Sequence, residues 1–328
     1  MSAQIESLGH YVPETIIDND YFVSKLKLDT SDEWIQSRSG IKKRRFVDNN
    51  TSSADIGYQA ALNCLSKSNK TIKDIDLILV ATSTPDHLAF PSTACIIQEK
   101  LNAQPTPAFD ISAACSGFCF ALSTAQAYLL NPLYNTILVI GVDCLSTITN
   151  MQDRATSILF ADGAGAAIVT KSSKNNGIIY SKMFSDGALG SILSIPKGGS
   201  KYPINNSILN EKSHFIQMQG KAVFKTAITT IVPAIKKALA ESNITPQDIA
   251  YLICHQANIR IIQTIGDQLN IDQTKLICNV EQYGNTSAAS IPLAMSEHHE
   301  KTPFKKGDIL VLAGFGAGFT WGITILKW

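Results

Sequence analysis

The chain has 328 residues, of which 45% are hydrophobic and 17% are charged, and its formal net charge at pH 7 is +1. This composition provides enough apolar side chains for a sizeable core and excludes a disordered chain. The balanced charge gives no reason to expect nucleic acid or a membrane surface as a partner. The seven cysteines are odd in number and are not regularly spaced. This pattern is typical of a protein of the reducing cytoplasm rather than of a disulfide framework.

We expect a soluble, cytoplasmic protein without a structural metal site. The first residues, MSAQIESLGHYVPETI, do not show the basic segment followed by an apolar one that marks a signal peptide. No apolar run in the sequence approaches the roughly 18 residues of a membrane-spanning helix. The sequence also lacks the paired Cys-x-x-Cys steps that indicate structural zinc.

Apolar, β-branched runs alternate along the chain with stretches of helical pattern. The predicted strands are Ile75–Thr82, Ala108–Ile111, Thr136–Val142, Ala166–Thr170, Tyr251–Cys254, Leu276–Val280 and Ile309–Ala313. The predicted helices are Ser116–Leu130, Ala222–Ser242, Ile259–Leu269 and Ser287–His299. Because most of these strands are apolar throughout, we expect both faces of the sheet to be covered. The alternation predicts an α/β architecture with a buried sheet.

The two halves of the sequence resemble each other. Three pairs of segments match in the same order: TIKDIDLILVAT with TPQDIAYLICHQ, IIQEKLN with IIQTIGDQLN, and TILVIG with DILVLAG. We interpret them as an internal duplication, with the segment KSSKNNGI near residues 171–178 interrupting the apolar pattern between the halves. The predicted domains are therefore 1–172 and 173–328, packed face to face. When the two halves are aligned on these matching segments, Cys115 of the first half falls roughly opposite Asn285 of the second. A cleft shared by the two halves would therefore bring both residues together.

Cys115 is the candidate nucleophile. An apolar strand ends near Ile111, small residues follow, and a helical run begins at Ser116, which places Cys115 at a strand-to-helix turn. The unpaired N–H groups of a helix N-terminus stabilise an anion, so we expect them to lower the pKa of this thiol. Cys119 lies one helical turn further on and is more typical of a core residue.

Three further segments bring polar groups to strand ends. His255 ends an apolar strand in LICHQANIR and is followed by a polar cluster that is unusual directly after a buried strand. Asn285 stands in GNTS, which by itself is also typical of a turn and helix N-cap. The segment AGFGAGFTWG is rich in glycine but has neither the GxxxxGK(S/T) nor the GxGxxG spacing of phosphate-binding loops. We therefore interpret it as a tight turn that offers backbone N–H groups to an oxyanion.

The ordered motifs AACSGF, CHQANIR, YGNTSAAS and GFGAGFTWG resemble the ketoacyl-acyl-carrier-protein synthase III family. DEWIQSRSGI at 32–41 and FADGAGAA at 160–167 resemble further motifs of this family, and the match runs from about residue 5 to the last residue. The resemblance implies the thiolase fold, an α/β arrangement of duplicated αβαβα layered halves with buried mixed sheets. It also implies a homodimer.

The resemblance implies a catalytic role for three side chains. Cys115 would be the acylated nucleophile, and His255 and Asn285 would hydrogen-bond the thioester oxygen of a malonyl unit as it loses carbon dioxide. The backbone N–H groups of Cys115 and Ala317 would form the oxyanion hole. A ping-pong scheme through an acyl-enzyme follows, and it requires neither a metal nor a redox cofactor.

The resemblance also implies binding roles. Trp34, Arg38 and Arg154 would contact coenzyme A, and Phe90 would cross the dimer interface to close the partner's acyl pocket. Phe315 is also expected at the acyl pocket. The residues expected to face the acyl carrier protein are Lys225, Gln256 and Arg260.

The implied activity is that of a β-ketoacyl-acyl-carrier-protein synthase III, an acyltransferase that condenses a short acyl-CoA with malonyl-acyl-carrier protein to start fatty acid synthesis. Two alternatives stay open: a specialised acyltransferase or condensing enzyme of secondary metabolism, and a non-catalytic partner of such enzymes, against which the intact Cys–His–Asn set argues. Asp267 and Gln268 depart from the family pattern, because a well-studied branch carries two lysines at these positions facing the carrier protein. The departure leaves the choice between a carrier-protein and a coenzyme A thioester as second substrate open.

Overall fold

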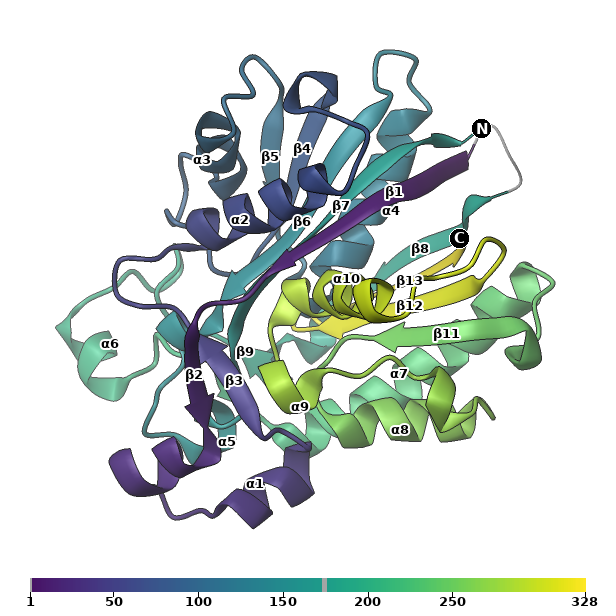
Figure 1. The fold of residues 1–328 in the computed structure, drawn as a ribbon. Helices are drawn as coiled ribbons and strands as arrows, with labels where there is room; N and C mark the ends of the chain where they lie inside the picture. Colours follow the sequence, from purple (N-terminus) through teal and green to yellow (C-terminus); the bar gives the residue numbers. More distant parts are fainter. Residues whose placement is uncertain (1, 173–175) are drawn as a thin grey trace.

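The computed structural model describes residues 2–172 and 176–328 and arranges them in layers (Figure 1). A five-stranded sheet and a four-stranded sheet lie one above the other, with helices between them and on both outer faces. Apolar side chains pack in separate clusters between successive layers. The order of layers is therefore αβαβα, as the family resemblance implied.

The first sheet is built from residues of the first half of the chain, in the order β1-β7-β6-β4-β5. Strand β4 runs parallel to β5 and β6, whereas β7 pairs antiparallel with β1 and β6, so the sheet is mixed. All residues of β4 and β6 are buried, which explains their continuous apolar sequence. The strands are β1 Ser2–Tyr11, β4 Leu77–Ala81, β5 Ala108–Ile111, β6 Thr136–Cys144 and β7 Asp162–Ser172.

The second sheet is built from the second half, in the order β11-β12-β13-β8. Strands β11 and β12 are parallel, and the other pairs are antiparallel. Its strands are β8 Gly177–Ser185, β11 Ile249–Cys254, β12 Ile309–Gly316 and β13 Thr320–Lys327. Two small antiparallel pairs lie outside the main sheets: β2 Thr15–Asp18 with β3 Lys43–Phe46, and β9 Leu193–Ser194 with β10 Gln217–Met218.

The helices cover the sheets in pairs. Helices α2 and α3 pack on the outer face of the first sheet, α4 and α10 lie between the sheets, and α7 and α8 pack on the second sheet (Figure 1). Serine residues cap several of these helices; Ser52, for example, forms a reciprocal capping box with Asp55 at the start of α2. The helices are α1 Asp32–Ser39, α2 Ser53–Ser66, α3 Thr93–Lys100, α4 Gly117–Leu129, α5 Arg154–Ser157, α6 Asn206–Glu211, α7 Gly220–Glu241, α8 Ile259–Gln268, α9 Val280–Tyr283 and α10 Ser290–Lys301.

The two sheets have equivalent strand orders, with β8, β13, β12 and β11 in the places of β1, β7, β6 and β4. The matching segments that precede β4 and β11 even form the same capping box, in which Thr71 pairs with Asp74 and Thr245 with Asp248. These features support an internal duplication. The proposed boundary between 172 and 173 falls at residues 173–175, outside the described residues, so the division into two domains stays a proposal.

One predicted strand is wrong. Residues Leu276–Val280 form no strand, and in the described chain Leu276 makes a single bridge to Leu252 of β11. A short 3-10 helix ends at Lys275 and α9 begins at Val280, so the segment is too short to extend the pairing. The bridge nevertheless lies where β5 lies in the first sheet. The chain therefore turns toward α10 in the second half as it turns toward α4 in the first.

Among the described residues, no helix has both the length and the apolar character required to cross a membrane.

Candidate active site

Cys115 lies on the turn between β5 and α4, in a short 3-10 helix that spans Ala114–Ser116. Ala114 has a φ of 46°, an unusual value for a residue with a side chain, and it brings the sulfur of Cys115 to the cleft between the two halves. The turn is held by the Ser116 hydroxyl, which donates to Ala113 O at 2.7 Å, and by the Thr320 hydroxyl, which donates to the same carbonyl at 3.0 Å. Thr320 of β13 thus fixes the turn that carries the candidate nucleophile of the other half.

Asn285 lies at the equivalent turn of the second half, before the 3-10 helix Ser287–Ala289 and α10. Its backbone is fixed by two hydrogen bonds: Asn285 N donates to Leu159 O, and Ala161 N donates to Asn285 O, each at 2.9 Å. The backbone N–H of Ser287 donates to the side-chain Oδ1 of Asn285 at 3.0 Å. Because the amide oxygen is occupied in this way, the amide NH₂ of Asn285 is available as a donor.

His255 follows the last residue of β11, and its backbone N–H continues the pairing with β12 by donating to Ala313 O at 2.8 Å. Its Nδ1 lies 2.7 Å from the Ser290 hydroxyl, and that hydroxyl accepts the Gln256 backbone N–H at 3.3 Å. When the Ser290 hydroxyl donates to Nδ1, the ring proton lies on Nε2 and can point into the cavity. Burial lowers the pKa of His255 to about 3, so the ring is neutral at physiological pH.

Two adjoining cavities meet at Cys115. The first, about 140 Å³, is lined by Cys115, His255 and Asn285 and extends between α7 and α8. The second, about 260 Å³, is lined by Cys115, Ala317 and a set of apolar side chains that includes Ile148, Ile195 and Ile216. One cavity thus carries hydrogen-bond donors and the other is apolar.

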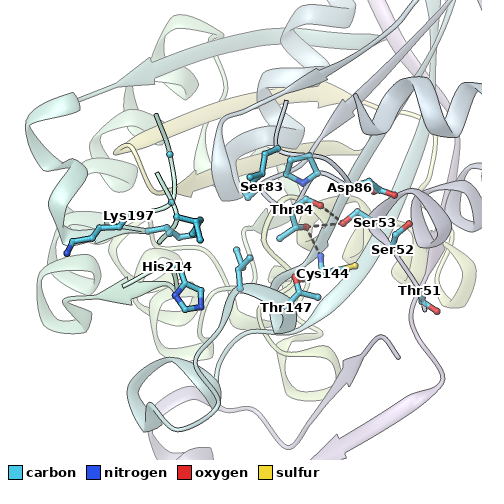
Figure 2. Close-up of a pocket in the computed structure, with 17 residues that line it drawn as sticks. Thr51, Ser52, Ser53, Ser83, Thr84, Asp86, Cys144, Thr147, Lys197 and His214 are labelled. Carbon is cyan, nitrogen blue, oxygen red and sulfur yellow. Dashed lines mark hydrogen bonds between the residues drawn. The ribbon is translucent and has the colours of Figure 1, made fainter. Parts of the chain in front are cut away.

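A larger cavity of about 650 Å³ continues from the apolar one, since Ser83, Ile148 and Ile195 line both. Figure 2 shows its walls, with Ser53, Thr84 and Asp86 on one side and Lys197 and His214 on the other. The Ser53 hydroxyl donates to Thr84 O at 2.6 Å, and Cys144 N donates to the Thr84 hydroxyl at 2.8 Å. Its polar lining groups are therefore partly engaged with one another.

Comparisons with known proteins agree with this arrangement. The model of 3-oxoacyl-[acyl-carrier-protein (ACP)] synthase III matches residues 109–187, and the model of the C-terminal part of the same family matches residues 239–328. A β-ketoacyl-[acyl-carrier-protein] synthase III of Clostridioides difficile (strain 630) is 43% identical over 326 residues, covering 99% of this chain and 98% of the relative. The chain belongs to the 3-oxoacyl-[acyl-carrier-protein] synthase III family. The predicted family and enzyme class, an acyltransferase-type condensing enzyme, are confirmed.

Solved structures confirm the fold of this synthase III family member. The 3-oxoacyl-[acyl-carrier-protein] synthase III of Aquifex aeolicus VF5 is 37% identical and superposes with a TM-score of 0.91, covering 99% of this chain and 100% of that one. The priming β-ketosynthase of the R1128 polyketide biosynthetic pathway is 30% identical, with a TM-score of 0.89, and covers 99% of this chain and 96% of that one.

The prediction for the pKa of the nucleophile is wrong in direction. Burial, together with the negative charge of Asp143, raises the pKa of Cys115 to about 12, although a hydrogen bond from the Ser287 side chain acts in the opposite sense. The sulfur precedes α4 and is almost completely enclosed, so desolvation of the thiolate outweighs the effect of the helix N-terminus. The resting protein therefore holds a thiol, and acylation needs a proton acceptor.

The residues expected to contact coenzyme A lie together near the β2–β3 pair. The guanidinium groups of Arg154 and Arg38 lie 4.8 Å and 5.8 Å from the centre of the Trp34 ring. Arg154 also contacts the backbone carbonyl of Asp29, and the Asn258 amide donates to Arg38 O at 2.9 Å. A flat aromatic face with two cations beside it suits an adenine and its phosphates.

One residue expected at the carrier-protein face is misplaced. Gln256 is 1% exposed; its amide donates to Cys254 O and Ile277 O and accepts Asn279 N–H, so it fixes the segment after β11 and cannot face a partner. Lys225 and Arg260 do lie on the surface, on α7 and α8, and the Arg260 guanidinium lies 5.6 Å from the Phe224 ring.

The two aromatic residues expected at the acyl pocket lie in different places. Phe315 is buried and its ring meets that of His255 edge to face at 5.3 Å, so it lines the donor-bearing cavity rather than the apolar one. Phe90 is 85% exposed and lines none of the cavities described here within its own chain. Its role at a pocket therefore depends on a partner subunit.

Sequence reasoning missed three residues that support this site. The Ser290 hydroxyl lies against Nδ1 of His255, Asp143 is fully buried, and Gly316 lies directly against Cys115. Asp143 ends a strand in LVIGVDC, where an acidic residue after a buried apolar run is a usable signal. Ser287 and Ser290 stand in the NTSAAS motif but had no assigned role.

The buried state of His255 should make the stability of the fold depend on pH. The pKa of His255 is about 3 in the folded chain and 6.5 in the unfolded chain. Above pH 6.5 the ring is therefore neutral in both states, and its contribution to the free energy of unfolding has its full value. As the pH falls below 6.5, the unfolded chain binds a proton that the folded chain does not, and stability is lost. Relative to His255→Gln, the free energy of unfolding should fall by about 1.4 kcal/mol per pH unit below pH 6.

Urea denaturation of both proteins between neutral pH and pH 5 would measure this difference. Burial raises the pKa of Asp162 to about 6, which gains stability as the pH falls, but this group is present in both proteins and cancels. A difference that stays constant with pH would contradict a neutral, buried His255.

Proposed function

We propose that the protein is a homodimeric β-ketoacyl-acyl-carrier-protein synthase III that starts fatty acid synthesis in the cytoplasm. It takes a short acyl group from acyl-CoA onto Cys115 and condenses it with malonyl-acyl-carrier protein. The observation that carries the proposal is the meeting of Cys115, His255 and Asn285, from three separate segments of the chain, at one cavity. No cofactor is required, because the chemistry consists of thioester exchange and decarboxylation.

In the first half-reaction, the sulfur of Cys115 attacks the thioester carbon of acyl-CoA. A carbon–sulfur bond forms to Cys115, the bond to coenzyme A breaks, and the thiol proton ends on the sulfur of coenzyme A. The negative charge that develops on the carbonyl oxygen would be held by the backbone N–H groups of Cys115 and Ala317, which line the same cavity.

In the second half-reaction, the malonyl thioester loses carbon dioxide and leaves an enolate. His255 and Asn285 both line the donor-bearing cavity. There, the Nε2–H of the neutral His255 ring and the NH₂ of Asn285 can donate to the enolate oxygen. The enolate carbon then attacks the acyl group on Cys115. A carbon–carbon bond forms, the sulfur leaves, and the chain is two carbons longer.

The apolar cavity beside Cys115 suits the acyl chain, and a second subunit would complete it. Leu88 and Phe90 are 90% and 85% exposed on one loop, which is costly for side chains of this size without a partner. Strand β5, at the edge of the first sheet, has four half-exposed residues and can pair with another strand. Both features support a homodimer in which the partner's Phe90 closes the acyl cavity.

The carrier protein would dock at the mouth of the donor-bearing cavity, between α7 and α8. Lys225 and Arg260 place positive charge there, which would steer an acidic partner. Asp267 is also exposed on α8, where its carboxylate accepts a hydrogen bond from Gln273 at 2.6 Å. Because this acidic residue weakens the patch, and because a polyketide priming synthase is among the similar structures, a specialised condensing enzyme is the second candidate.

Acylation of Cys115 tests the proposal directly. After mixing with acetyl-CoA, the intact protein should gain one acetyl group, and peptide mapping should place it on Cys115. Cys115→Ser should show no acylation, whereas the matched control Cys119→Ser, which changes a buried cysteine one helical turn away, should be acylated normally. Acylation at another cysteine would contradict the proposal.

The product then separates the two candidates. Addition of malonyl-acyl-carrier protein to the acylated protein should release a β-ketoacyl-carrier protein, identified by mass. Efficient condensation with malonyl-CoA and none with the carrier protein would favour the specialised enzyme.

A further inference from the structure

Two hydroxyl groups lie between the two turns that line the apolar cavity beside Cys115. The Ser116 hydroxyl, on the turn before α4, lies 2.7 Å from Ala113 O and 2.9 Å from the Thr320 hydroxyl. The Thr320 hydroxyl lies 3.0 Å from Ala113 O and 2.9 Å from Ala317 O, on the turn that follows β12. Thr320 by itself therefore contacts both turns, and Ser116 contacts Thr320.

These two turns carry the N–H groups proposed for the oxyanion hole. Cys115 and Ala317 line the same cavity. In the described ranges 2–172 and 176–328, neither of their N–H groups donates to a backbone carbonyl, so both remain available to the oxygen of a bound thioester. The two turns belong to different halves of the chain. The separation between the two N–H groups is therefore set by contacts between the halves.

The hydrogen bonds across this boundary converge on one atom. Within the described residues, every hydrogen bond that joins the segment 113–117 to the segment 316–320 passes through Thr320 Oγ1. Gly316 lies against Cys115 but has no side chain to hold it. Phe319 exchanges two backbone hydrogen bonds with Asp186, at 2.8 Å and 2.9 Å, which tie that end of the turn to its own half. Thr320 is therefore the hydrogen-bonding link between the two turns.

The link does not depend on the direction in which the hydroxyl protons point. Each hydroxyl can donate to one neighbour and accept from another, and Thr320 Oγ1 takes part in three of the four oxygen–oxygen contacts. Without the Thr320 hydroxyl, only the contact between Ser116 and Ala113 O remains, and it lies within one turn. Without the Ser116 hydroxyl, Thr320 still contacts both carbonyls. The connection between the halves is lost in the first case and kept, with less support, in the second.

We propose that Thr320 is a positioning residue that fixes the separation between the N–H groups of Cys115 and Ala317. The inference rests on the proposed acyl-enzyme function, because the two donors serve the attack of the sulfur on a thioester. Such donors stabilise the charge that develops in the transition state, so displacing one of them lowers the rate and leaves substrate binding unchanged. The donors proposed for the enolate line the other cavity, so decarboxylation does not depend on Thr320.

The test uses variants that separate the hydroxyl from the shape of the side chain. Thr320→Val removes the hydroxyl and keeps the branched shape, Thr320→Ser keeps the hydroxyl, and Ser116→Ala removes the supporting group. The matched control is Thr324→Val, the same change at a buried position of β13, whose hydroxyl lies 3.4 Å from that of Ser181. Single-turnover acylation over a range of acetyl-CoA concentrations, followed by intact mass, is measured beside release of carbon dioxide from malonyl-carrier protein and thermal unfolding.

Thr320→Val should lower the maximal acylation rate by about 10- to 10²-fold, the upper figure being typical of a displacement of roughly 1 Å at a reacting centre. The half-saturating concentration of acetyl-CoA should not change, because the donors act in the transition state. Ser116→Ala should show a smaller loss in the same direction. Thr320→Ser and Thr324→Val should be acylated at close to the wild-type rate, and decarboxylation should be unchanged in all four variants.

The carbonyl stretch of the acyl-enzyme gives a second readout. Hydrogen bonds to a carbonyl oxygen lower its stretching frequency, so an isotope-labelled acetyl group on Cys115 should absorb at lower frequency in the folded protein than after denaturation. In Thr320→Val this infrared band should move to higher frequency and broaden. A wild-type band at the frequency of the denatured acyl-protein would overturn the inference, whether or not the valine variant folds.

Acylation of Thr320→Val at the wild-type rate would also overturn the positioning role while leaving the proposed function intact. An equal loss in Thr324→Val, or a parallel loss of decarboxylation in Thr320→Val, would do the same, since either would indicate a general loosening of the fold. Absence of acylation in the wild-type protein would instead overturn the proposed function, and the role of Thr320 with it.

Discussion

Replacing His255 or Asn285 with alanine is expected to suppress the decarboxylation of malonyl-carrier protein while Cys115 still accepts an acyl group from acyl-CoA. Each substitution removes one of the two N–H donors that face the enolate oxygen. Loss of a single donor of this kind reduces the rate about 10²- to 10³-fold, or about 3–4 kcal/mol. The donors act on the second half-reaction, so the first should proceed at close to its normal rate.

Two assays on the same samples separate the half-reactions. Intact mass after mixing with acetyl-CoA reports acylation of Cys115, and carbon dioxide released from malonyl-carrier protein reports decarboxylation. His10→Ala is a suitable control, because His10 is a half-buried histidine whose ring bonds Ser296 away from the cavity. A His255→Ala protein that decarboxylates malonyl-carrier protein but can no longer be acylated would contradict these roles.

The orientation of the two donors gives this prediction a further check. In the tautomer that donates from Nε2, the Nδ1 of His255 accepts a hydrogen bond from the Ser290 hydroxyl, and Ser290→Ala would remove this bond without removing the ring. The ring could then hold its proton on either nitrogen, and part of the population would present no donor to the enolate. Decarboxylation should therefore fall less in Ser290→Ala than in His255→Ala. An equal loss would mean that the serine has another function.

Part of the site could be predicted because two of its residues follow strands that are easy to detect. Cys115 and His255 each come directly after an apolar run, and in an α/β fold such strand ends meet at a common edge. The repeated segments placed Cys115 opposite Asn285, and in the structure these residues do lie at equivalent turns before α4 and α10. Repetition thus predicted a common cleft for Cys115 and Asn285, whereas the family resemblance implied the catalytic roles of all three residues.

The two site predictions that were wrong concern the direction of a side chain and the degree to which it is enclosed. Gln256 stands in a polar cluster after a strand and was assigned to the surface, but its amide satisfies backbone groups that would otherwise be buried without partners. The pKa of Cys115 was assigned from the helix that follows it, whereas the degree of enclosure by the other half decides it. Neither enclosure nor side-chain direction is encoded in the local pattern.

Strands with a mixed pattern were also missed. Strand β8, Gly177–Ser185, has buried residues at its beginning and exposed ones further on, so it shows neither a continuous apolar run nor a clear alternation. Strand β1 is long and pairs with β7 along its length, with a register shift between Ile5 and Ser7, yet its sequence SAQIESLGHY carries several polar residues. In both strands, tertiary pairing decides the conformation and local propensity contributes little.

The glycine-rich segment leads to a second prediction of large effect. Gly316 ends β12, and a Cβ atom placed there would lie 2.8 Å from both the N and the Cβ of Cys115 and 3.1 Å from its sulfur. The glycine allows the β12–β13 turn to lie directly against the nucleophile, so its role is close approach rather than phosphate binding. Gly316→Ala should therefore displace Cys115 or push the turn that carries Ala317 away from it.

We expect Gly316→Ala to lower the rate of Cys115 acylation by about 10²-fold, the cost of a displacement of roughly 1 Å at a reacting centre. Overpacking should also reduce the free energy of unfolding by about 1–3 kcal/mol. Gly187→Ala is the matched control, because no atom lies within 4 Å of the Cβ that it would add. Single-turnover acylation and urea denaturation measure the two effects.

A comparison with Gly314→Ala separates the two consequences. A Cβ at Gly314 would lie 3.0 Å from the Cα of Ser116 and 3.1 Å from the sulfur of Cys119, so it presses on the same segment, and its three nearest atoms belong to Ser116 and Cys119 rather than to Cys115. This variant should lose stability to a similar extent but retain more of its acylation rate. If Gly316→Ala were acylated as fast as Gly314→Ala, contact with the nucleophile would not be the reason for the glycine. The separation between the two variants measures how closely the position of the sulfur, rather than the integrity of the fold, limits acylation.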